Sequence, residues 1–298
     1  MNYKILYEET LVQLNKLKTN YKRLKKENEL LKKHNSKGST PSINGNAYEK
    51  IIYDVIKNAH VTYIDNTIPD TNQGSLLSKK GNRFIQIDES KLGGSSADID
   101  LKCVYNKENI GIEAKKHNTP DWMQCSLKYN LKNKIWEGSA TCKIPPECRN
   151  IFNDLIKDIN IYDGDVPPFI NNKITHDEWK EIKKSTDKWN DIYIPIPSDI
   201  IKKLYSLKGC QYIQISDYGL YHLGNDICNF NVPEFIIEQQ LRIRTKIHSS
   251  KNKNGFCSIS VIAACQPIDI KKLEKSRYSL DCAEQLPPNL TIQNDNLG

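Results

Sequence analysis

The sequence lacks several patterns that would assign the protein to a common class. No apolar run approaches the roughly 18 residues that a membrane-spanning helix needs, and the first residues, MNYKILYEETLVQLNK, lack the apolar core of a signal peptide. Nine cysteines are present, but none forms a CxxC pair, which argues against a zinc ribbon and against a disulfide framework. We therefore expect an intracellular protein whose thiols are buried.

Excess positive charge is scarce outside the N-terminal segment. The formal net charge is +7, yet residues 1–37 hold ten Lys and Arg against four Asp and Glu, while residues 38–298 hold 33 against 32. Phosphate binding depends on local clusters of basic residues and not on the total charge. The net charge is therefore weak evidence that the body of the protein binds nucleic acid.

Residues 1–35 carry a heptad pattern that predicts a short coiled-coil helix. Leucines repeat at position d, and one a position is polar; the pattern comprises Leu14, Tyr21 and Asn28 at a, and Leu17, Leu24 and Leu31 at d. An Asn at one a position favours two strands in register, so we expect a homodimer through residues 7–33. The alternative is a single amphipathic helix packed on its own body, because three to four heptads is near the lower limit for a coiled coil.

A folded domain is expected at residues 47–298, after a linker at 36–46 that is rich in Ser, Asn, Gly and Pro. Hydrophobic periodicity predicts helices at 47–59, 119–131, about 175–187 and 198–207. Strands are predicted at 61–65, 83–88, 97–105, 109–116, 211–215, 219–223, 238–247 and 256–264. This mixture without a repeat period indicates an α/β or α+β domain, with an insertion around residues 131–197.

The most informative segment is the predicted hairpin at 97–116, ADIDLKCVYNKENIGIEAKK. Because side chains alternate along a strand, Asp98 and Asp100 share one face of the first strand, and Glu113 and Lys115 share one face of the second. A tight turn at 106–108 places Asp100 opposite Glu113 or Lys115. Carboxylates at such short distances repel one another, and a bound divalent cation commonly neutralises this repulsion.

Such a patch suits metal-assisted hydrolysis of a phosphodiester. Carboxylate oxygens hold Mg²⁺, or Mn²⁺, which polarises the phosphate and lowers the pKa of a bound water, while a lysine orients that water or neutralises developing charge. The alternative is a set of surface salt bridges, because acidic-x-Lys triplets such as Glu178-x-Lys180 recur in this Lys-rich chain. What distinguishes Glu113 is its apolar strand, NIGIEAK, beside a strand that presents aspartates.

This arrangement resembles the PD-(D/E)xK nuclease superfamily over residues 45–129. The resemblance implies a restriction-endonuclease-like core, which is a mixed four-stranded sheet flanked by helices. In that family an early helix carries a glutamate near the metal, matched here by Glu49, and the helix after the (D/E)xK strand carries a polar residue, matched by Gln124. The implied metal ligands are Glu49, Asp98, Asp100 and Glu113, and the implied catalytic residues are Asp98, Glu113, Lys115 and Gln124.

A second candidate feature is a basic stripe at residues 241–247, LRIRTKI. Alternation puts Arg242, Arg244 and Lys246 on one strand face, where they could contact DNA phosphates. The alternative is an ordinary solvated strand face.

The sequence therefore predicts a metal-dependent endonuclease that hydrolyses DNA as a homodimer. Two other hypotheses belong to different classes: a non-cleaving nucleic-acid-binding or recombination-associated module on the same fold, and a coiled-coil assembly protein whose body is a scaffold. The complete carboxylate-lysine set favours the first hypothesis. Substrate specificity depends on loops and insertions that the fold does not determine.

Overall fold

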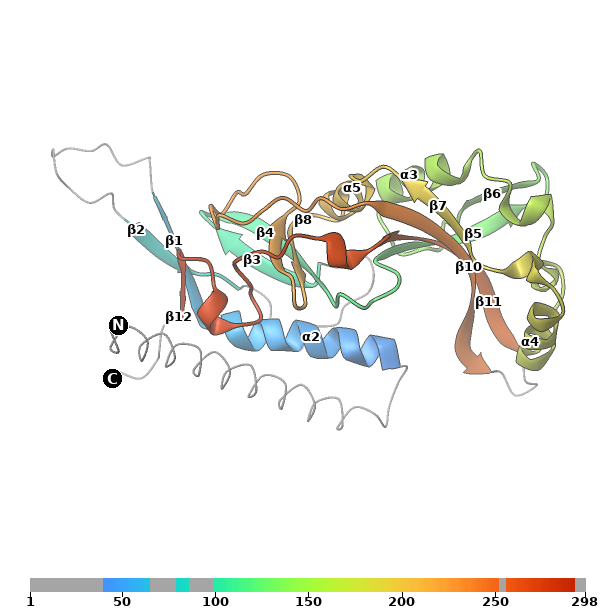
Figure 1. Cartoon of the computed structure of the whole chain (residues 1–298), viewed down its shortest axis with the longest axis horizontal. Helices are drawn as coiled ribbons and strands as arrows, with labels where there is room; N and C mark the ends of the chain where they lie inside the picture. The colour runs from blue at the N-terminus through green and yellow to red at the C-terminus, as the bar shows by residue number, and fades with distance from the viewer. Residues whose placement is uncertain (1–39, 65–78, 86–98, 252–255, 293–298) are drawn as a thin grey trace, which may run out of the picture.

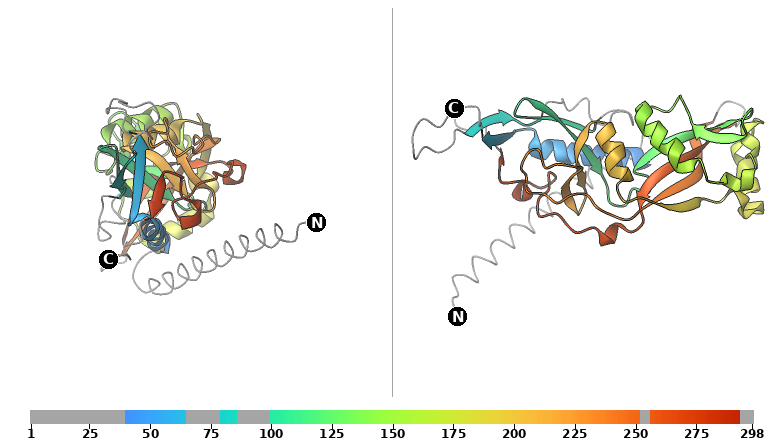
Figure 2. Two further views of the ribbon diagram at one scale, coloured as in Figure 1. Left: turned by 90° about the vertical axis from the view of Figure 1, so that its left-hand side faces the viewer. Right: turned by 90° about the horizontal axis from the view of Figure 1, so that it is seen from above.

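A computed structural model describes residues 40–64, 79–85, 99–251 and 256–292 of the chain (Figure 1). The predicted coiled coil at 1–35 and the predicted ligand Asp98 lie outside the described residues. No helix within the described ranges is both long and apolar enough to cross a bilayer. Figures 1 and 2 show two main groups of strands that follow one another along the long axis of the molecule.

The first group is a mixed four-stranded sheet, as predicted. Its strand order is β3-β4-β8-β9, formed by β3 (Leu101–Tyr105), β4 (Glu108–Lys115), β8 (Cys210–Ile215) and β9 (Gly219–His222). The β3–β4 and β8–β9 pairs are antiparallel, whereas β4 and β8 run parallel. The parallel pair needs a long crossover, and the chain between β4 and β8 supplies most of the second group of elements.

One face of this sheet packs on helix α2 (Thr40–Ile56). Ile52 and Ile56 of the helix share a buried cluster with Leu101 and Ile112 of the sheet. The helix begins at Thr40, so residues 40–46 are helical and the expected linker at 36–46 is wrong there. A helix whose later turns pack on a sheet can extend over residues of low intrinsic helix propensity, which composition alone does not reveal.

A small sheet of order β12-β1-β2 lies at the end of α2. It consists of β1 (Ala59–Ile64), β2 (Lys79–Arg83) and β12 (Leu290–Ile292), all paired antiparallel. Phe84 and Ile85, which follow β2, are buried in the same cluster as α2. The C-terminal part of the chain thus closes back on the first strand.

The second main group is a five-stranded antiparallel sheet of order β6-β5-β11-β10-β7. Its strands are β5 (Met123–Asn130), β6 (Ile135–Gly138), β7 (Ile192–Ile196), β10 (Gln239–Lys251) and β11 (Cys257–Pro267), and its helices are α3 (Pro146–Ile156) and α4 (His176–Ser185). The predicted helix at 119–131 is wrong, because this segment contains β5. Met123, Cys125 and Leu127 are buried on one face, which is the period of a strand; the Thr-Pro-Asp start was misleading.

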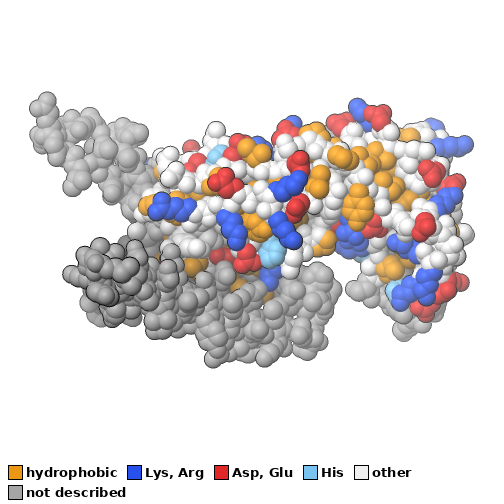
Figure 3. Space-filling view, in the orientation of Figure 1, with side chains coloured by type: hydrophobic (Ala, Val, Ile, Leu, Met, Phe, Trp, Pro, Cys, Tyr) orange, Lys and Arg blue, Asp and Glu red, His pale blue; other side chains and the backbone are white. Residues whose placement is uncertain are grey.

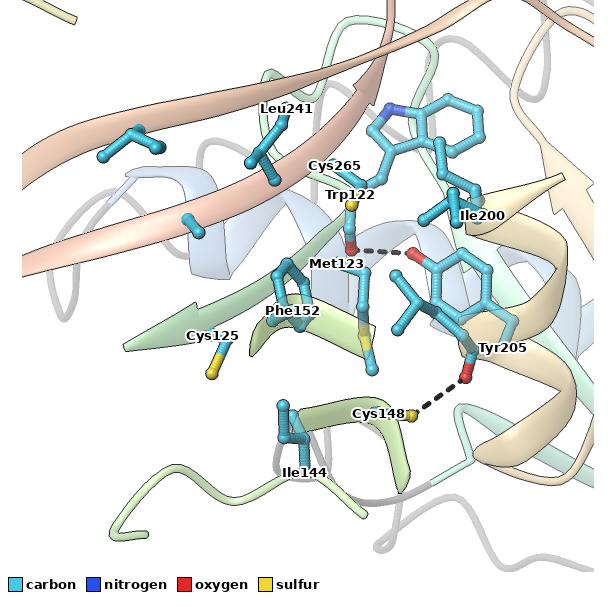
Figure 4. Packing of buried hydrophobic residues seen from close by; sticks show 14 of the residues in the cluster. Trp122, Met123, Cys125, Ile144, Cys148, Phe152, Ile200, Tyr205, Leu241 and Cys265 are labelled. Atoms are coloured by element: carbon cyan, nitrogen blue, oxygen red, sulfur yellow. Dashed lines mark hydrogen bonds between the residues drawn. The ribbon is translucent and has the colours of Figure 1, made fainter. Parts of the chain in front are cut away.

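Helix α5 (Ile200–Leu207) connects the two main sheets. Leu204 and Tyr205 share one core with Ile213 of the four-stranded sheet and with Met123 of the five-stranded sheet. The Tyr205 hydroxyl donates to the backbone oxygen of Trp122 at 2.7 Å, and the Cys148 thiol donates to the Leu204 oxygen (Figure 4). These contacts attach α5 to the segment before β5 and to α3.

Candidate active site

The turn between β3 and β4 determines which acidic residues meet. Asn106 and Lys107 both have positive φ, 46° and 66°, which is the pattern of a tight two-residue hairpin turn. The turn sets Leu101 opposite Ile112, and the next step along the chain brings Asp100 beside Glu113. The Ala114 amide donates to Asp100 Oδ2 at 2.9 Å, which fixes the aspartate there.

Two lysines converge on the Glu113 carboxylate. Lys115 Nζ lies 2.6 Å from Oε1, and Lys208 Nζ lies 2.7 Å from Oε2. Lys208 Nζ is also 4.0 Å from Asp100 Oδ1, so this ammonium lies between the two carboxylates. The side chains of Glu113 and Lys208 are 2% and 3% exposed, whereas those of Asp100 and Lys115 are 14% and 18% exposed. The cluster is therefore buried on one side and open to solvent on the other.

The carboxyl groups of this cluster have opposite pKa shifts. Burial, together with the charge of Glu113, raises the pKa of Asp100 to about 7, and the charge of Glu49 contributes in the same direction. Burial would also raise the pKa of Glu113, but the ammonium groups of Lys115 and Lys208 outweigh it and hold that pKa below its usual value. Glu113 is thus a firm anion, while Asp100 exchanges its proton near neutral pH.

Tyr205 forms the floor beneath both lysines. Lys115 Nζ and Lys208 Nζ lie 5.7 and 6.0 Å from the centre of its ring, within the range of cation–π attraction. Burial raises the pKa of the Tyr205 hydroxyl well above its usual value, so the group stays protonated and keeps its hydrogen bond to Trp122. The helix that supplies Tyr205 therefore also fixes the lysines.

Glu49 approaches the cluster from α2 and is 8% exposed. Its neighbour Tyr48 donates to Asp281 Oδ2 at 2.9 Å and accepts from Gln214 Nε2 at 3.2 Å. This buried network attaches the start of the packed part of α2 to β8. The helix is thereby held where the charge of Glu49 acts on Asp100. The role of Glu49 as a metal ligand stays a prediction.

Gln124 does not join this cluster. It lies on β5 opposite Ala264 of β11, and its side chain points away from the face that buries Met123 and Cys125. Within the described part of the chain, no hydrogen bond of its side chain reaches Asp100, Glu113 or Lys115. The assignment of Gln124 depended on a helix that is in fact a strand, and the geometry gives it no contact with the site.

The basic stripe lies on β10 as predicted, but two of its residues are paired with carboxylates. Arg242 contacts Asp191 Oδ2 at 2.6 Å and Asp121 Oδ1 at 3.3 Å, and Arg244 contacts Asp121 Oδ2 at 2.5 Å. Lys246 follows on the same face, since it pairs with Ser260 in the register of Arg242 with Ala264. Figure 3 shows charges of both signs interspersed on the visible face. The stripe is less cationic than the sequence alone indicates.

Lys208 is a charged member of the cluster that the sequence analysis missed. It follows α5 directly and precedes Gly209, which has φ +94°. A lysine and a glycine at the end of a helix are the ordinary features of a C-terminal cap. The pattern therefore did not indicate that Lys208 belongs to the site. Only the parallel pairing of β8 with β4 brings it beside Glu113.

The carboxylates of the site could hold a divalent cation of the magnesium type. Among the described residues no group of three or more His, Cys, Asp or Glu forms a metal cluster, but Mg²⁺ is commonly held by only one or two carboxylates together with water and substrate phosphate. Asp100 and Glu113 supply two such carboxylates, and burial together with the charge of Glu113 raises the pKa of Asp100. Glu49 adds a third nearby negative charge.

Comparison with known proteins gives little further guidance. No family model matches the chain, and no curated protein matches it significantly. Among solved structures, a match is found to HhaI endonuclease in complex with DNA, at 15% sequence identity and a TM-score of 0.33; it covers 63% of this chain and 85% of that chain. The assignment of function therefore depends on the site itself.

Proposed function

We propose that the protein is a metal-dependent endonuclease of restriction-endonuclease-like fold that hydrolyses DNA phosphodiester bonds. The observation that carries the proposal is the buried Asp100–Glu113 pair with Lys115 on the same face of a mixed sheet. Buried charges are expensive and rarely improve stability over apolar packing. Clusters with strongly shifted pKa values are instead typical of functional sites.

Each side chain has a role that follows from its position. Asp100 and Glu113 would hold the divalent cation, which lowers the pKa of a bound water and neutralises charge on the phosphate. Lys115, which is partly exposed and paired with Glu113, would orient the attacking water and stabilise negative charge at the scissile phosphate. Asp98 stays a predicted ligand, and Gln124 has no role in this scheme.

The proposal has two alternatives. A purely structural salt-bridge network does not explain why Asp100 is kept beside Glu113, where its pKa is raised. A non-cleaving DNA-binding module would not need both acids and the lysine together. DNA as partner and a homodimer formed by residues 7–33 belong to this proposal, and the second would bring two sites to one duplex.

One assay separates the hypotheses. The purified chain is incubated with supercoiled plasmid in Mg²⁺ and, in parallel, in EDTA. We expect nicked and linear DNA in Mg²⁺ alone. DNA that is retarded on a gel but uncut in either condition would support the non-cleaving module, and DNA that is neither bound nor cut would support the scaffold.

A further inference from the structure

The ammonium group of Lys208 lies between the two carboxylates that would hold a metal. It contacts Glu113 Oε2 at 2.7 Å and lies 4.0 Å from Asp100 Oδ1. The other Glu113 oxygen is bound to Lys115 at 2.6 Å, and Asp100 Oδ2 accepts the Ala114 amide at 2.9 Å. The carboxylate oxygens that face one another are therefore those that Lys208 bridges.

The turn that carries Lys208 packs closely against β4. A Cβ on Gly111 would lie 2.2 Å from the Gly209 oxygen, so the turn after α5 rests directly on β4. The Lys208 amide donates to the oxygens of Leu204 and Ser206, which fixes the start of the side chain at the end of α5. The Cys210 thiol, two residues on, also points at Glu113 Oε2 at 3.8 Å. A lysine placed this way has its ammonium directed at Glu113 and not at solvent.

We propose that Lys208 is a resident counter-ion of the metal-free site, which a divalent cation must displace from Glu113 and Asp100. This inference rests on the proposed function, because it concerns the same site. Lys208 holds the two carboxylates together before metal arrives, and it competes with metal for the same oxygens. Its long, flexible side chain allows the ammonium to leave while the backbone stays in place. Lys208 is thus a positioning residue that sets how much metal the site requires.

Direct metal binding tests the inference without any measurement of catalysis. Mn²⁺ is titrated calorimetrically into the full-length protein, Lys208→Met, Lys208→Gln and the control Lys203→Met. Lys203 lies on α5, which Lys208 follows, but it is exposed and pairs with Asp199, so the control removes the same charge away from the site. We expect one Mn²⁺ site in each protein, with affinity about tenfold higher in both Lys208 variants and unchanged in the control.

Thermal unfolding with and without metal gives a second readout, in which the metal-induced shift separates this role from that of a merely structural ion pair. Without metal, Lys208→Met should unfold at a lower temperature than the wild type, because Asp100 and Glu113 lose a shared cation. Added Mn²⁺ should raise its midpoint more than it raises that of the wild type. If Lys208→Met does not fold without metal, Lys208→Gln, which retains a hydrogen-bond donor for Glu113, serves for both measurements.

The outcomes are distinct. Wild-type protein that binds Mn²⁺ with variants of equal or weaker affinity overturns the role of Lys208 and leaves the nuclease proposal intact. Absence of Mn²⁺ binding in the wild type and both variants overturns the proposed function together with this inference. Equal tightening in Lys203→Met would show a general charge effect and would also overturn it.

Discussion

Gly111 on β4 lies so close to Gly209 that a Cβ at position 111 would stand 2.2 Å from the Gly209 carbonyl oxygen. Gly209 itself has φ +94°, a conformation that disfavours any residue with a side chain. The two glycines together allow the turn after α5 to contact the sheet. Lys208 reaches Glu113 only because of this approach.

Substitution of Gly111 by Ala should therefore disrupt the site through the backbone. The added methyl group collides with a backbone oxygen, so we expect a loss of at least about 2 kcal/mol in the free energy of unfolding. Gly224→Ala is the matched control, because nothing lies within 4 Å of its added Cβ. Urea denaturation measures both; equal stability of Gly111→Ala and wild type would contradict the close contact.

The stability of the metal-free protein should depend on pH through Asp100. Its pKa is raised from 3.8 to about 7 on folding, so between these values the folded state binds more protons than the unfolded state. The free energy of unfolding that Asp100 contributes must then fall as pH rises from about 4 to about 7 and stay level above. The lowered pKa of Glu113 affects stability only below its ordinary value of 4.5, at the acid end of this window.

Asp100→Asn should remove that dependence. Chemical denaturation in EDTA at about pH 5 and about pH 7.5 gives the slope for each protein. We expect the wild type to lose more stability than the variant between the two pH values. Parallel behaviour of the two proteins would show that the pKa of Asp100 is not raised by its surroundings.

The paired arginines make a specific prediction for DNA binding. Asp121, 9% exposed, is bound to both Arg242 and Arg244. Asp121→Asn should free Arg244 for phosphates, whereas Arg242 keeps its contact with Asp191. We expect higher affinity for unrelated DNA sequences and a salt dependence steeper by roughly one unit. Arg242→Ala with Arg244→Ala should do the reverse, with some loss of stability because Asp121 is left unpaired. Unchanged affinity in both would mean that this face does not contact DNA.

The N-terminal segment gives a prediction about assembly. Deletion of residues 1–37 should convert a dimer to a monomer and reduce double-strand cleavage more than nicking. The deletion also removes six of the seven net positive charges, so the control changes Leu17, Leu24 and Leu31 together to Gln, which keeps the charge. Light scattering that gives the same mass for the intact protein and this variant would contradict the dimer.

The sequence predicted the core of the site because strand alternation is a local property. Asp100, Glu113 and Lys115 meet as their spacing on a tight hairpin requires, and the four-stranded mixed sheet is confirmed. The prediction of a helix at 119–131 was wrong because the Thr-Pro-Asp pattern of a helix start masked the strand-like alternation of Met123, Cys125 and Leu127. That segment pairs with β6 on one side and, on the other, with β11, more than a hundred residues away.

Lys208 could not be found from the sequence for a related reason. Its contact with Glu113 spans 95 residues and depends on a parallel pairing and on two glycines in contact. Likewise, the basic stripe was correctly placed on one strand, but its partners Asp121 and Asp191 come from distant segments. Pairing across long separations determined both the missed residue and the reduced charge.

Cleavage by Lys115→Met tests the central claim most directly. Glu113→Ala is a poorer test, because it would leave Lys208 buried without its carboxylate, whereas Lys115→Met leaves the Glu113–Lys208 contact in place. Initial rates of plasmid nicking in Mg²⁺ are compared for wild type, Lys115→Met and Lys203→Met, with EDTA as the blank. The account predicts a rate lower by about 10²–10⁴ for Lys115→Met alone and no nicking in EDTA. Nicking by Lys115→Met at the wild-type rate, or wild-type nicking that persists in EDTA, would contradict it.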